Sequence, residues 1–446
     1  MKYSGLPAHG SDSLPYNFTT FIRSLYLFMK IAIAGFGAAA IGFIERMKDS
    51  GAEIHIFEKS KDVYSSSISG IRADGKLFVS SEMGGELDID TGLQKQMVDF
   101  WIDKTVNREV ETGRSFADPS YYSRFYEKGF QPVVSDFFHL GTEQLKEVLL
   151  NLFNEYSEHQ DLHFHFGEPV SEVHVEPDRV TFNGNSSFDH ALIAVGRSGH
   201  KLIGSVIKKY PDVVKESTRV DIGVRMELPD HIVSELNREM YEFKVKYKSK
   251  TGYMVRTFCN NPSGYVVIEN YGDFMTVNGH SKLSDKSVNT NFAVLTTVKL
   301  THPFNDPIGY GSHIARLTNI LGGEKVILQT YGNMVASKRT TSLYRVNPTL
   351  PEELYILGDI NLAYPRRIME SMIDFIENLN TVIPGVNHKD NLVYAPEIKF
   401  YSNRMDNEKF RNLTFIGDCS GYTRSIIYAT AHGWLTGEEI MRSMNQ

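Results

Sequence analysis

The segment from Ile31 to Glu58 constrains the fold of this chain more than any other stretch. It begins with the apolar run "IAIA", passes through a glycine turn and a helical stretch, and ends with "EIHIFE". Gly35, Gly37 and Ala40 occupy the three positions of the pattern G-x-G-x-x-G/A. Glu58 follows Gly35 at roughly the 20-residue spacing of an acid that accepts hydrogen bonds from a ribose. The segment therefore predicts a βαβ unit whose helix N-terminus faces a pyrophosphate.

Two other interpretations of this segment stay open. "MKIAIAGFGAAA" also resembles a secretory signal with an Ala-x-Ala cleavage site, although that leaves Glu58 unexplained and the apolar run to Ile44 is too short to span a bilayer. A purely structural βαβ unit is the other alternative. Residues 1–28 show no clear period, so we expect an N-terminal extension that is disordered or not native, with Met29 as the initiator, or else a short arm packed on the domain.

Composition excludes several classes of protein. The net charge of −7 and a pI near 6.1 argue against nucleic acid as the main partner. No run of 18 apolar residues occurs, so we expect no membrane span. The chain has only 2 cysteines, Cys259 and Cys419, and no C-x-x-C, which favours a reducing cytoplasm. No metal-binding motif is found, and no metal site is predicted.

The C-terminal stretch "NLTFIGDCSGYTRSIIYATAHGWL" indicates which dinucleotide is bound. It predicts a strand, the pair Gly417-Asp418, a turn and a long helix. FAD is long, and its flavin end needs a contact remote from the first glycine turn, whereas a simple NAD dehydrogenase needs none. Asp418 can accept a hydrogen bond from the ribityl chain, and the helix N-terminus near Ser425 and Ile426 can stabilise negative charge on the flavin. This combination favours FAD.

The remaining patterns predict the domain organisation. Helices are expected from Leu93 to about Arg108 and from Thr142 to about Ser157, and strands at "DLHFHF", "EVHVEPDRVTFNG" and "HALIAVG". Residues 221–349 are rich in strands. The predicted fold class is α/β, with a discontinuous FAD-binding Rossmann-type domain (29–220 and 350–446) and an inserted β-rich (α+β) substrate domain (221–349).

A second nucleotide site is not expected. The only later G-x-G, Gly309-Tyr310-Gly311, follows no apolar strand, and we interpret it as a turn that caps a helix. NAD(P)H is therefore expected at most as a transient reductant.

Several segments resemble a known family. "SGIRADGKL", "HLGTE", "DIGVRMELP", "VRTFCNNPSGYVV", "APEIKFYS" and "IGDCSGYTRSI" are similar to segments of the prokaryotic FAD-dependent dehydrogenase-like proteins of the FAD/NAD(P)-binding Rossmann superfamily. The resemblance implies bound FAD and a redox role, and it implies that Asp74 and Lys76 lie toward the flavin. The chain departs from the family's C-x-C-P-G-G at Cys259-Asn260-Asn261-Pro262-Ser263-Gly264, so a cysteine pair is not expected there. Cys419 is interpreted as a small buried thiol.

The candidate site residues follow from these patterns. The predicted cofactor-binding residues are Gly35, Gly37, Ala38, Ala39, Ala40, Glu58, Lys59, Asp74, Lys76, Val170, Gly196, Gly417, Asp418, Ser425 and Ile426. Lys76 and Arg256 are the catalytic candidates, with Asn278 and His280 as further residues that can orient an anionic or carbonyl substrate. A loop salt bridge is the alternative for Lys76, and a satisfied polar residue is the alternative for the other three.

A lysine series has two open interpretations. Lys244, Lys246, Lys248 and Lys250 alternate along "KVKYKSK", which predicts one face of a strand. An exposed edge strand protected by lysines is one interpretation, and a surface for an acidic partner is the other.

The predicted function is an FAD-dependent oxidoreductase that transfers a hydride between flavin N5 and an unidentified small molecule. The alternative is a non-catalytic binding protein on the same fold, similar to the Rab GDP-dissociation inhibitors.

Overall fold

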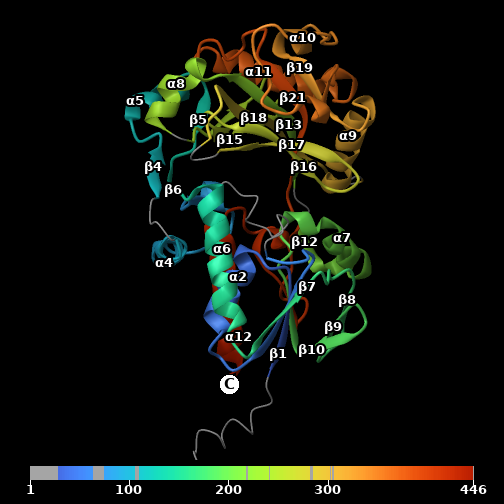
Figure 1. The fold of residues 1–446 in the computed structure, drawn as a ribbon. Coiled ribbons are helices and arrows are strands. Elements are labelled where there is room, and N and C mark those ends of the chain that lie inside the picture. Colours follow the sequence, from blue (N-terminus) through green and yellow to red (C-terminus); the bar gives the residue numbers. More distant parts are fainter. Residues whose placement is uncertain are drawn as a thin grey trace, which may run out of the picture.

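The structure is a computed structural model that describes residues 29–63, 75–105, 110–216, 219–240, 242–281, 285–301, 303 and 306–444. Two lobes are visible in Figure 1, one above the other, and each is built around a β-sheet. The lower lobe holds a five-stranded sheet, and the upper lobe holds an eight-stranded sheet. Segments far apart in the sequence contribute to each lobe.

The five-stranded sheet is parallel throughout. Its order is β23 (Leu413–Phe415), β11 (His190–Ile193), β1 (Lys30–Ala34), β2 (Glu53–Glu58) and β7 (Leu162–Phe166). From β1 the chain continues to β2 on one side, whereas β11 lies on the other side. The strand order therefore changes direction beside β1, and ligands of open α/β sheets bind at the carboxyl end of such a point. The predicted Rossmann-type sheet is confirmed.

The two faces of this sheet are covered differently. Helices α2 (Ala38–Met47), α6 (Gly141–Ser157) and α12 (Ile426–Met444) cover the face that carries Ile31 and Ile33. The other face carries Ala32 and Ala34, and against it pack α7 (His200–Lys209) and a small antiparallel sheet of β8 (Val173–Val175), β9 (Val180–Phe182) and β10 (Ser186–Phe188). Burial on both faces explains why β1 is a continuous apolar run.

Helices α2 and α12 are in backbone contact. A Cβ on Gly42 would lie 2.0 Å from the carbonyl oxygen of Thr430, and one on Gly433 would lie 1.9 Å from that of Ala39. Farther along, a Cβ on Gly437 would lie 3.0 Å from Cβ of Arg46. Helix α2 follows β1 and α12 follows β23, and these two parallel strands end at the same edge of the sheet. The two helices therefore run parallel, and both N-termini lie at the carboxyl edge of the parallel sheet.

The eight-stranded sheet is mostly antiparallel. Its order is β20 (Tyr355–Leu357), β19 (Val326–Thr330), β21 (Leu392–Phe400), β13 (Arg219–Pro229), β18 (Asn289–Lys299), β15 (Met254–Asn261), β14 (Val245–Lys248) and β5 (Phe130–Pro132). Residues 350–400, which the sequence assigns to the FAD-binding domain, lie in this second lobe. Its boundary falls at about residue 400 rather than 349, because β21 pairs with the distant β13. A buried strand such as "LVYAPEIKF" does not show by itself which sheet it joins.

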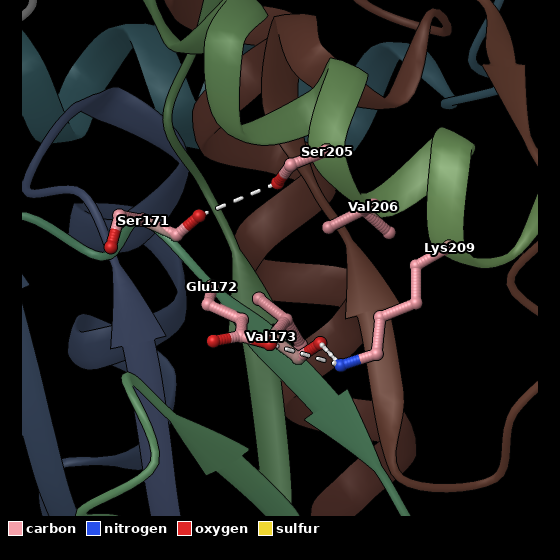
Figure 2. Close-up of a pocket in the computed structure, with 6 residues that line it drawn as sticks. All are labelled: Ser171, Glu172, Val173, Ser205, Val206 and Lys209. Atoms are coloured by element: carbon pink, nitrogen blue, oxygen red, sulfur yellow. Dashed lines mark hydrogen bonds and ion pairs between the residues drawn. The ribbon is translucent and has the colours of Figure 1, made fainter.

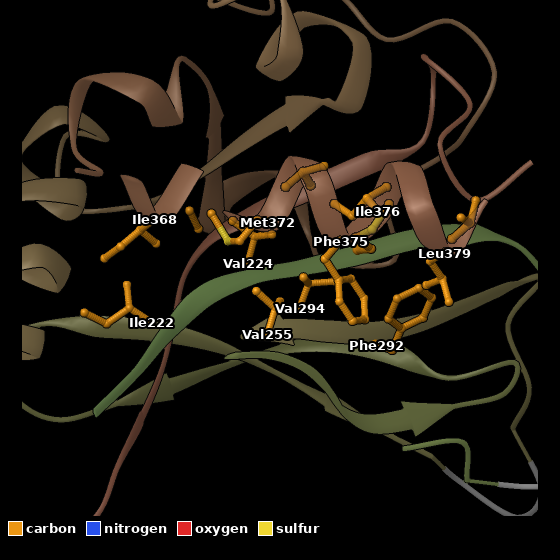
Figure 3. Packing of buried hydrophobic residues seen from close by; sticks show 14 of the residues in the cluster. Ile222, Val224, Val255, Phe292, Val294, Ile368, Met372, Phe375, Ile376 and Leu379 are labelled. Atoms are coloured by element: carbon orange, nitrogen blue, oxygen red, sulfur yellow. The ribbon is translucent and has the colours of Figure 1, made fainter. Parts of the chain in front are cut away.

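Helix α11 (Arg366–Leu379) packs on one face of this sheet (Figure 3). Its apolar residues recur every three or four positions, at Ile368, Met372, Phe375, Ile376 and Leu379, and form one stripe. That stripe lies over Ile222, Val224, Val255, Phe292 and Val294 of β13, β15 and β18. Burial of these side chains is the main contribution to the stability of the second lobe.

The remaining elements belong to either lobe or lie between the two. A three-stranded sheet contains β3 (Lys76–Phe78), β6 (Ser135–His139) and β4 (Glu111–Ser115). One two-stranded sheet contains β16 (Tyr265–Asn270) and β17 (Met275–His280). Another contains β12 (Val214–Glu216) and β22 (Arg404–Met405). The other helices are α3 (Ser81–Gly84), α4 (Thr91–Asp103), α5 (Pro119–Tyr126), α8 (Asp230–Glu239), α9 (Pro307–Leu321) and α10 (Tyr331–Val335). Short 3₁₀ helices are η1 (Arg197–Gly199), η2 (Pro211–Val213), η3 (Glu352–Leu354), η4 (Ile360–Leu362) and η5 (Gly417–Ser420).

Two further sequence predictions are tested by these elements. The helices expected near Leu93 and Thr142 are present as α4 and α6. Gly309 and Gly311 lie inside α9, whose first turn is capped by the Asp306 side chain accepting from Gly309 N, so they form no nucleotide turn. Within the described part of the chain, no helix combines the length and apolar character needed to cross a bilayer.

Candidate cofactor site at the carboxyl edge of the parallel sheet

Four predicted residues meet at one edge because parallel strands end together there. Gly35, Glu58, Gly196 and Gly417 follow or end β1, β2, β11 and β23. Gly35 has φ of +99°, and a Cβ at this position would lie 2.8 Å from the carbonyl oxygen of Ala194. Only glycine fits this turn, which brings the chain from β1 into α2.

The N-terminus of α2 is open. Gly37 occupies the N-cap position, and no side chain caps the helix. Ile41 N donates to Gly37 O at 2.9 Å, so the N–H groups of Ala38, Ala39 and Ala40 precede the first intrahelical bond. These N–H groups and the positive end of the helix dipole form an anion-binding arrangement at the place where the sequence predicts the pyrophosphate.

Glu58 retains acceptor capacity despite its burial. Its side chain is 5% exposed; Oε2 accepts from Phe36 N at 3.0 Å, and Oε1 accepts from Ser60 N at 3.0 Å and Ser60 Oγ at 2.8 Å. A carboxylate offers about four lone-pair positions, so Oε2 can accept one more hydrogen bond. This chemistry suits a ribose hydroxyl. Lys59 lies at the same edge, where its Nζ donates to Ser198 Oγ at 3.4 Å.

Asp418 lies beside the start of α2. A Cβ on the preceding Gly417 would lie 2.7 Å from Cβ of Ala39. Asp418 Oδ1 accepts from Thr423 Oγ1 at 2.9 Å, and Oδ2 lies 3.2 Å from Nε of Arg197. Burial raises the pKa of Asp418, and Arg197 opposes that shift. The partner Arg197 was missed from the sequence, although it directly follows the predicted Gly196.

The N-terminus of α12 completes the edge. Ser425 Oγ accepts from Tyr428 N at 3.3 Å, so Ser425 acts as the N-cap and Ile426 begins the helix. Cys419 is fully buried, its Sγ–H donates to Ile193 O at 3.0 Å, and burial raises its pKa to about 12. The interpretation of Cys419 as a small buried thiol is confirmed.

The last two predicted cofactor residues are Val170 and Asp74. Val170 follows β7 and packs, partly buried, against the cluster on the β8–β10 side of the sheet. Asp74 lies outside the described residues.

Lys76 is held in a buried ion pair. It lies on β3, is 4% exposed, and its Nζ donates to Glu242 Oε2 at 2.8 Å and to Asn260 O at 2.9 Å. The salt-bridge alternative is therefore the one observed, with the difference that Glu242 belongs to the second lobe rather than to the same loop. A catalytic role for Lys76 stays a prediction.

Arg256 is also paired. Its Nε donates to Asp221 Oδ2 at 2.7 Å, it contacts the hydroxyl of Tyr401, and its guanidinium lies 4.8 Å from the centroid of Phe258. Although burial opposes the charged form, Asp221 and Tyr401 raise the pKa of Arg256 above its ordinary value. The guanidinium is thus fixed on the polar face of the eight-stranded sheet.

That polar face holds a second buried pair that the sequence analysis missed. Arg225 Nε and Nη2 each donate to Glu397 at 2.7 Å, Nη1 donates to Asn291 Oδ1 at 2.8 Å, and Nη2 reaches Asn278 Oδ1 at 3.4 Å. Arg225 and Glu397 are both 0% exposed. The alternation in "DIGVRMELP", with charges at every second or fourth position between apolar residues, is the signal that predicts this face.

The lysine series differs from the expected edge strand. Strand β14 lies between β15 and β5, so it is not an edge, and Lys244 just before it is buried. Lys244 Nζ donates to Met83 Sδ at 2.9 Å, and no carboxylate in the described part of the chain forms an ion pair with it. Burial lowers the pKa of Lys244 to about 7, and the nearby Arg256 lowers it further. The short strand β5, which is distant in sequence, pairs with β14 on the side that the lysine pattern predicts to be an exposed edge.

A hollow on the molecule contains none of the predicted site residues. Figure 2 shows it between β8 and α7, lined by Ser171, Glu172, Val173, Ser205, Val206 and Lys209. Lys209 Nζ lies 3.3 Å from Glu172 Oε1 and donates to Val173 O at 3.2 Å. The residues that line this hollow therefore have no role in the predicted cofactor site.

Comparisons with known proteins place part of the chain in a flavoprotein context. Residues 219–399 match a family described as "FAD-dependent protein, C-terminal domain-like". The match covers the second lobe and less than half of the chain, and it does not extend to the dehydrogenase-like group. No curated protein matches the chain.

Several solved structures align with most of the chain at low sequence identity. A putative FAD-containing monooxygenase from Photorhabdus luminescens subsp. laumondii TTO1 is 13% identical, with a TM-score of 0.43, and the alignment covers 94% of this chain and 89% of that one. A 2,6-dihydroxypyridine-3-hydroxylase from Arthrobacter nicotinovorans is 8% identical, with a TM-score of 0.40, and the alignment covers 93% and 84%. Because both TM-scores lie below 0.5, neither likeness assigns an activity to this chain.

Proposed function

We propose that this protein is an FAD-dependent oxidoreductase that acts on a small molecule. The observation that carries the proposal is the carboxyl edge of the parallel sheet, where the turn before α2 contacts Glu58 with its spare acceptor and where α12 also begins. The FAD-dependent description of the matched family, which covers the other lobe, supports the same cofactor.

The residues at this edge fit FAD in order along its length. The N–H groups of Ala38, Ala39 and Ala40 are available to the pyrophosphate, and Glu58 Oε2 is available to the adenosine ribose. In this proposal Asp418 accepts a hydrogen bond from the ribityl chain, and the N-terminus of α12 stabilises the negative charge of the flavin. When bound, FAD supplies hydride or electron transfer.

The second lobe supplies the substrate side in this proposal. Lys244 contacts Met83 of α3, and Gly85, directly after α3, forms a bridge with Thr423 just before α12. Lys244 and Arg256 of the polar face therefore lie on the route from the eight-stranded sheet to the predicted flavin end. Two buried cations favour a substrate with a carbonyl or anionic group, which they can orient.

Flavin reduction tests this function. The wild-type protein, loaded with FAD, is mixed anaerobically with NADH, NADPH and candidate carbonyl or hydroxyl compounds while the flavin band is followed. We expect slow, non-saturating reduction by the nicotinamides, because no second nucleotide turn is found in the described residues, and faster reaction with a substrate. Arg256→Ala should slow the substrate reaction and keep its FAD, whereas Arg366→Ala is a control, because Arg366 is exposed and pairs with Glu370 on the surface of α11.

The outcomes separate the two predicted classes of function. A protein that takes up no FAD contradicts the proposal. FAD that binds tightly but reacts with no donor favours the non-catalytic binding protein. Saturable, fast reduction at micromolar NADPH contradicts the absence of a dedicated nicotinamide site.

A further inference from the structure

Three histidines and one glutamate gather on one face of the parallel sheet. Glu53 and His55 alternate along β2, and His163 and His165 alternate along the neighbouring edge strand β7. The register pairs His55 with His163, so their side chains lie side by side. The face is the one that carries β8–β10, where the ring of His55 also meets that of Phe188.

Three of these residues present ligand atoms at metal-binding distances. Glu53 Oε1 lies 2.9 Å from His55 Nε2 and 3.8 Å from His163 Nε2, and the three atoms all lie within 4.8 Å of one another. A tetrahedral ion with bonds of about 2.0–2.1 Å separates its ligand atoms by roughly 3.4 Å. The observed spacings bracket that value, so small side-chain adjustments suffice.

The surroundings of His55 orient it as a ligand. His55 Nδ1 lies 3.0 Å from His165 Nε2, and His165 Nδ1 lies 3.9 Å from Glu168. A hydrogen bond on the far ring nitrogen fixes the orientation of metal-binding histidines.

We propose that Glu53, His55 and His163 bind one divalent transition-metal ion of the Zn²⁺ class, with water in the fourth position. Two imidazoles and one carboxylate are a ligand set that suits Zn²⁺. The ion replaces the ammonium of Lys30, which lies 3.0 Å from Glu53 Oε2 and whose side chain is 51% exposed and free to move into solvent.

The position of this site separates it from the cofactor edge. Glu53 begins β2, whereas Glu58 ends it, so the metal and the dinucleotide lie at opposite ends of the same strand. An ion here joins β2 to the edge strand β7 and acts as a structural clamp. The inference does not depend on FAD, and its failure leaves the proposed function intact.

Calorimetric titration of the full-length, tag-free, chelator-treated protein with ZnCl₂ tests the site. We expect one ion per chain at this site, at least tenfold weaker binding in His163→Ala, and a rise in melting temperature of the wild type on adding Zn²⁺. His174→Ala is the matched control, because His174 on β8 forms a similar pair with Glu176 at 3.5 Å, and among the described residues this pair belongs to no group of three potential ligands. Its Zn²⁺ affinity should equal that of the wild type.

The variants keep the test independent of folding. His163 is 41% exposed, so its replacement should be tolerated even if His55→Ala fails to fold, and Glu53→Gln offers a second variant. Equal FAD content in wild type and His163→Ala is expected. Wild-type protein that binds no Zn²⁺ at about 100 µM, or a His163→Ala variant that binds it as tightly as wild type, would overturn the proposal.

Discussion

The two sheets of this molecule differ in the groups that surround their buried carboxylates. At the edge of the parallel sheet, Glu58 is surrounded by backbone and hydroxyl donors, and no cation in the described residues pairs with it. On the polar face of the eight-stranded sheet, Glu397 and Asp221 are paired with Arg225 and Arg256. Glu58, held by N–H and hydroxyl groups, keeps a lone pair for a ligand, whereas both oxygens of Glu397 accept from the guanidinium of Arg225.

The carboxylate of the parallel sheet is therefore expected to bind a ligand, whereas those of the eight-stranded sheet are expected to stabilise the fold. In the parallel sheet, polar atoms at the carboxyl edge are available to the proposed FAD. The eight-stranded sheet uses most of its charges to hold its own strands and the neighbouring hairpin in register. Variants of each kind should therefore fail in different assays.

The largest expected effect is on folding, from Arg225→Met. It removes Arg225 from the buried Glu397, whose remaining ion pair is with Lys399 at 3.2 Å, and breaking a buried pair costs about 3–5 kcal/mol. Urea denaturation followed by circular dichroism measures the loss. The double variant Arg225→Met/Glu397→Leu should recover most of it, and the exposed-pair control Arg366→Ala should change stability by less than about 1 kcal/mol. A loss no larger than that of the control would show that this pair does not hold the second lobe.

A smaller effect, and on binding rather than folding, is expected from Glu58→Ala. Removing a hydrogen bond to a charged group costs about 1.5–3 kcal/mol, which is roughly a ten- to hundredfold loss of FAD affinity. Asp418→Ala should also weaken FAD binding, at the ribityl end. Equilibrium dialysis of the apoprotein against FAD measures both, and unchanged affinity in Asp418→Ala would remove that residue from the site.

The sequence predicts these two regions unequally. The strand, glycine turn, helix and Glu58 form one local pattern, so the fingerprint and the parallel sheet are predicted correctly. The partners Arg225 and Glu397 are 172 positions apart and meet only because β21 pairs with β13, which no local pattern reveals. The same non-local pairing moves the domain boundary to about residue 400, and the return of β5 to the second sheet changes the interpretation of the lysine series.

The ion-pair partner of Lys76 could not be predicted from the sequence either. The resemblance placed it toward the flavin, whereas its ion pair with Glu242 depends on the packing of β3 against the second lobe. The histidines of β2 and β7 are visible in the sequence as alternating "EIH" and "HFH". Their convergence follows only from the register of the two strands.

The smallest effect is expected from Lys244→Met, and it depends on pH. The pKa of Lys244 is lowered from 10.5 to about 7 in the folded protein, so between pH 7 and 10.5 the unfolded state binds more protons than the folded state. The free energy of unfolding therefore rises with pH through that window. Below pH 7 the destabilisation by the buried charge of Lys244 is present in full. Lys244→Met removes the charge, and we expect a gain of about 1 kcal/mol or more at pH 7 that shrinks toward pH 9.5.

Melting temperatures of both proteins across pH 6 to 9.5 measure this difference. A gain independent of pH would show that Lys244 is not destabilised by its charge in the folded state.

The most direct test of the cofactor site compares FAD with its two halves. If the N-terminus of α2 binds the ADP end and the N-terminus of α12 binds the flavin end, FAD gains from both contacts at once. Titration of the apoprotein should then give an FAD affinity at least about a hundredfold higher than that of either ADP or FMN. Equal binding of FAD and FMN, or no binding of FAD, would contradict the proposal that these two helices together hold the dinucleotide.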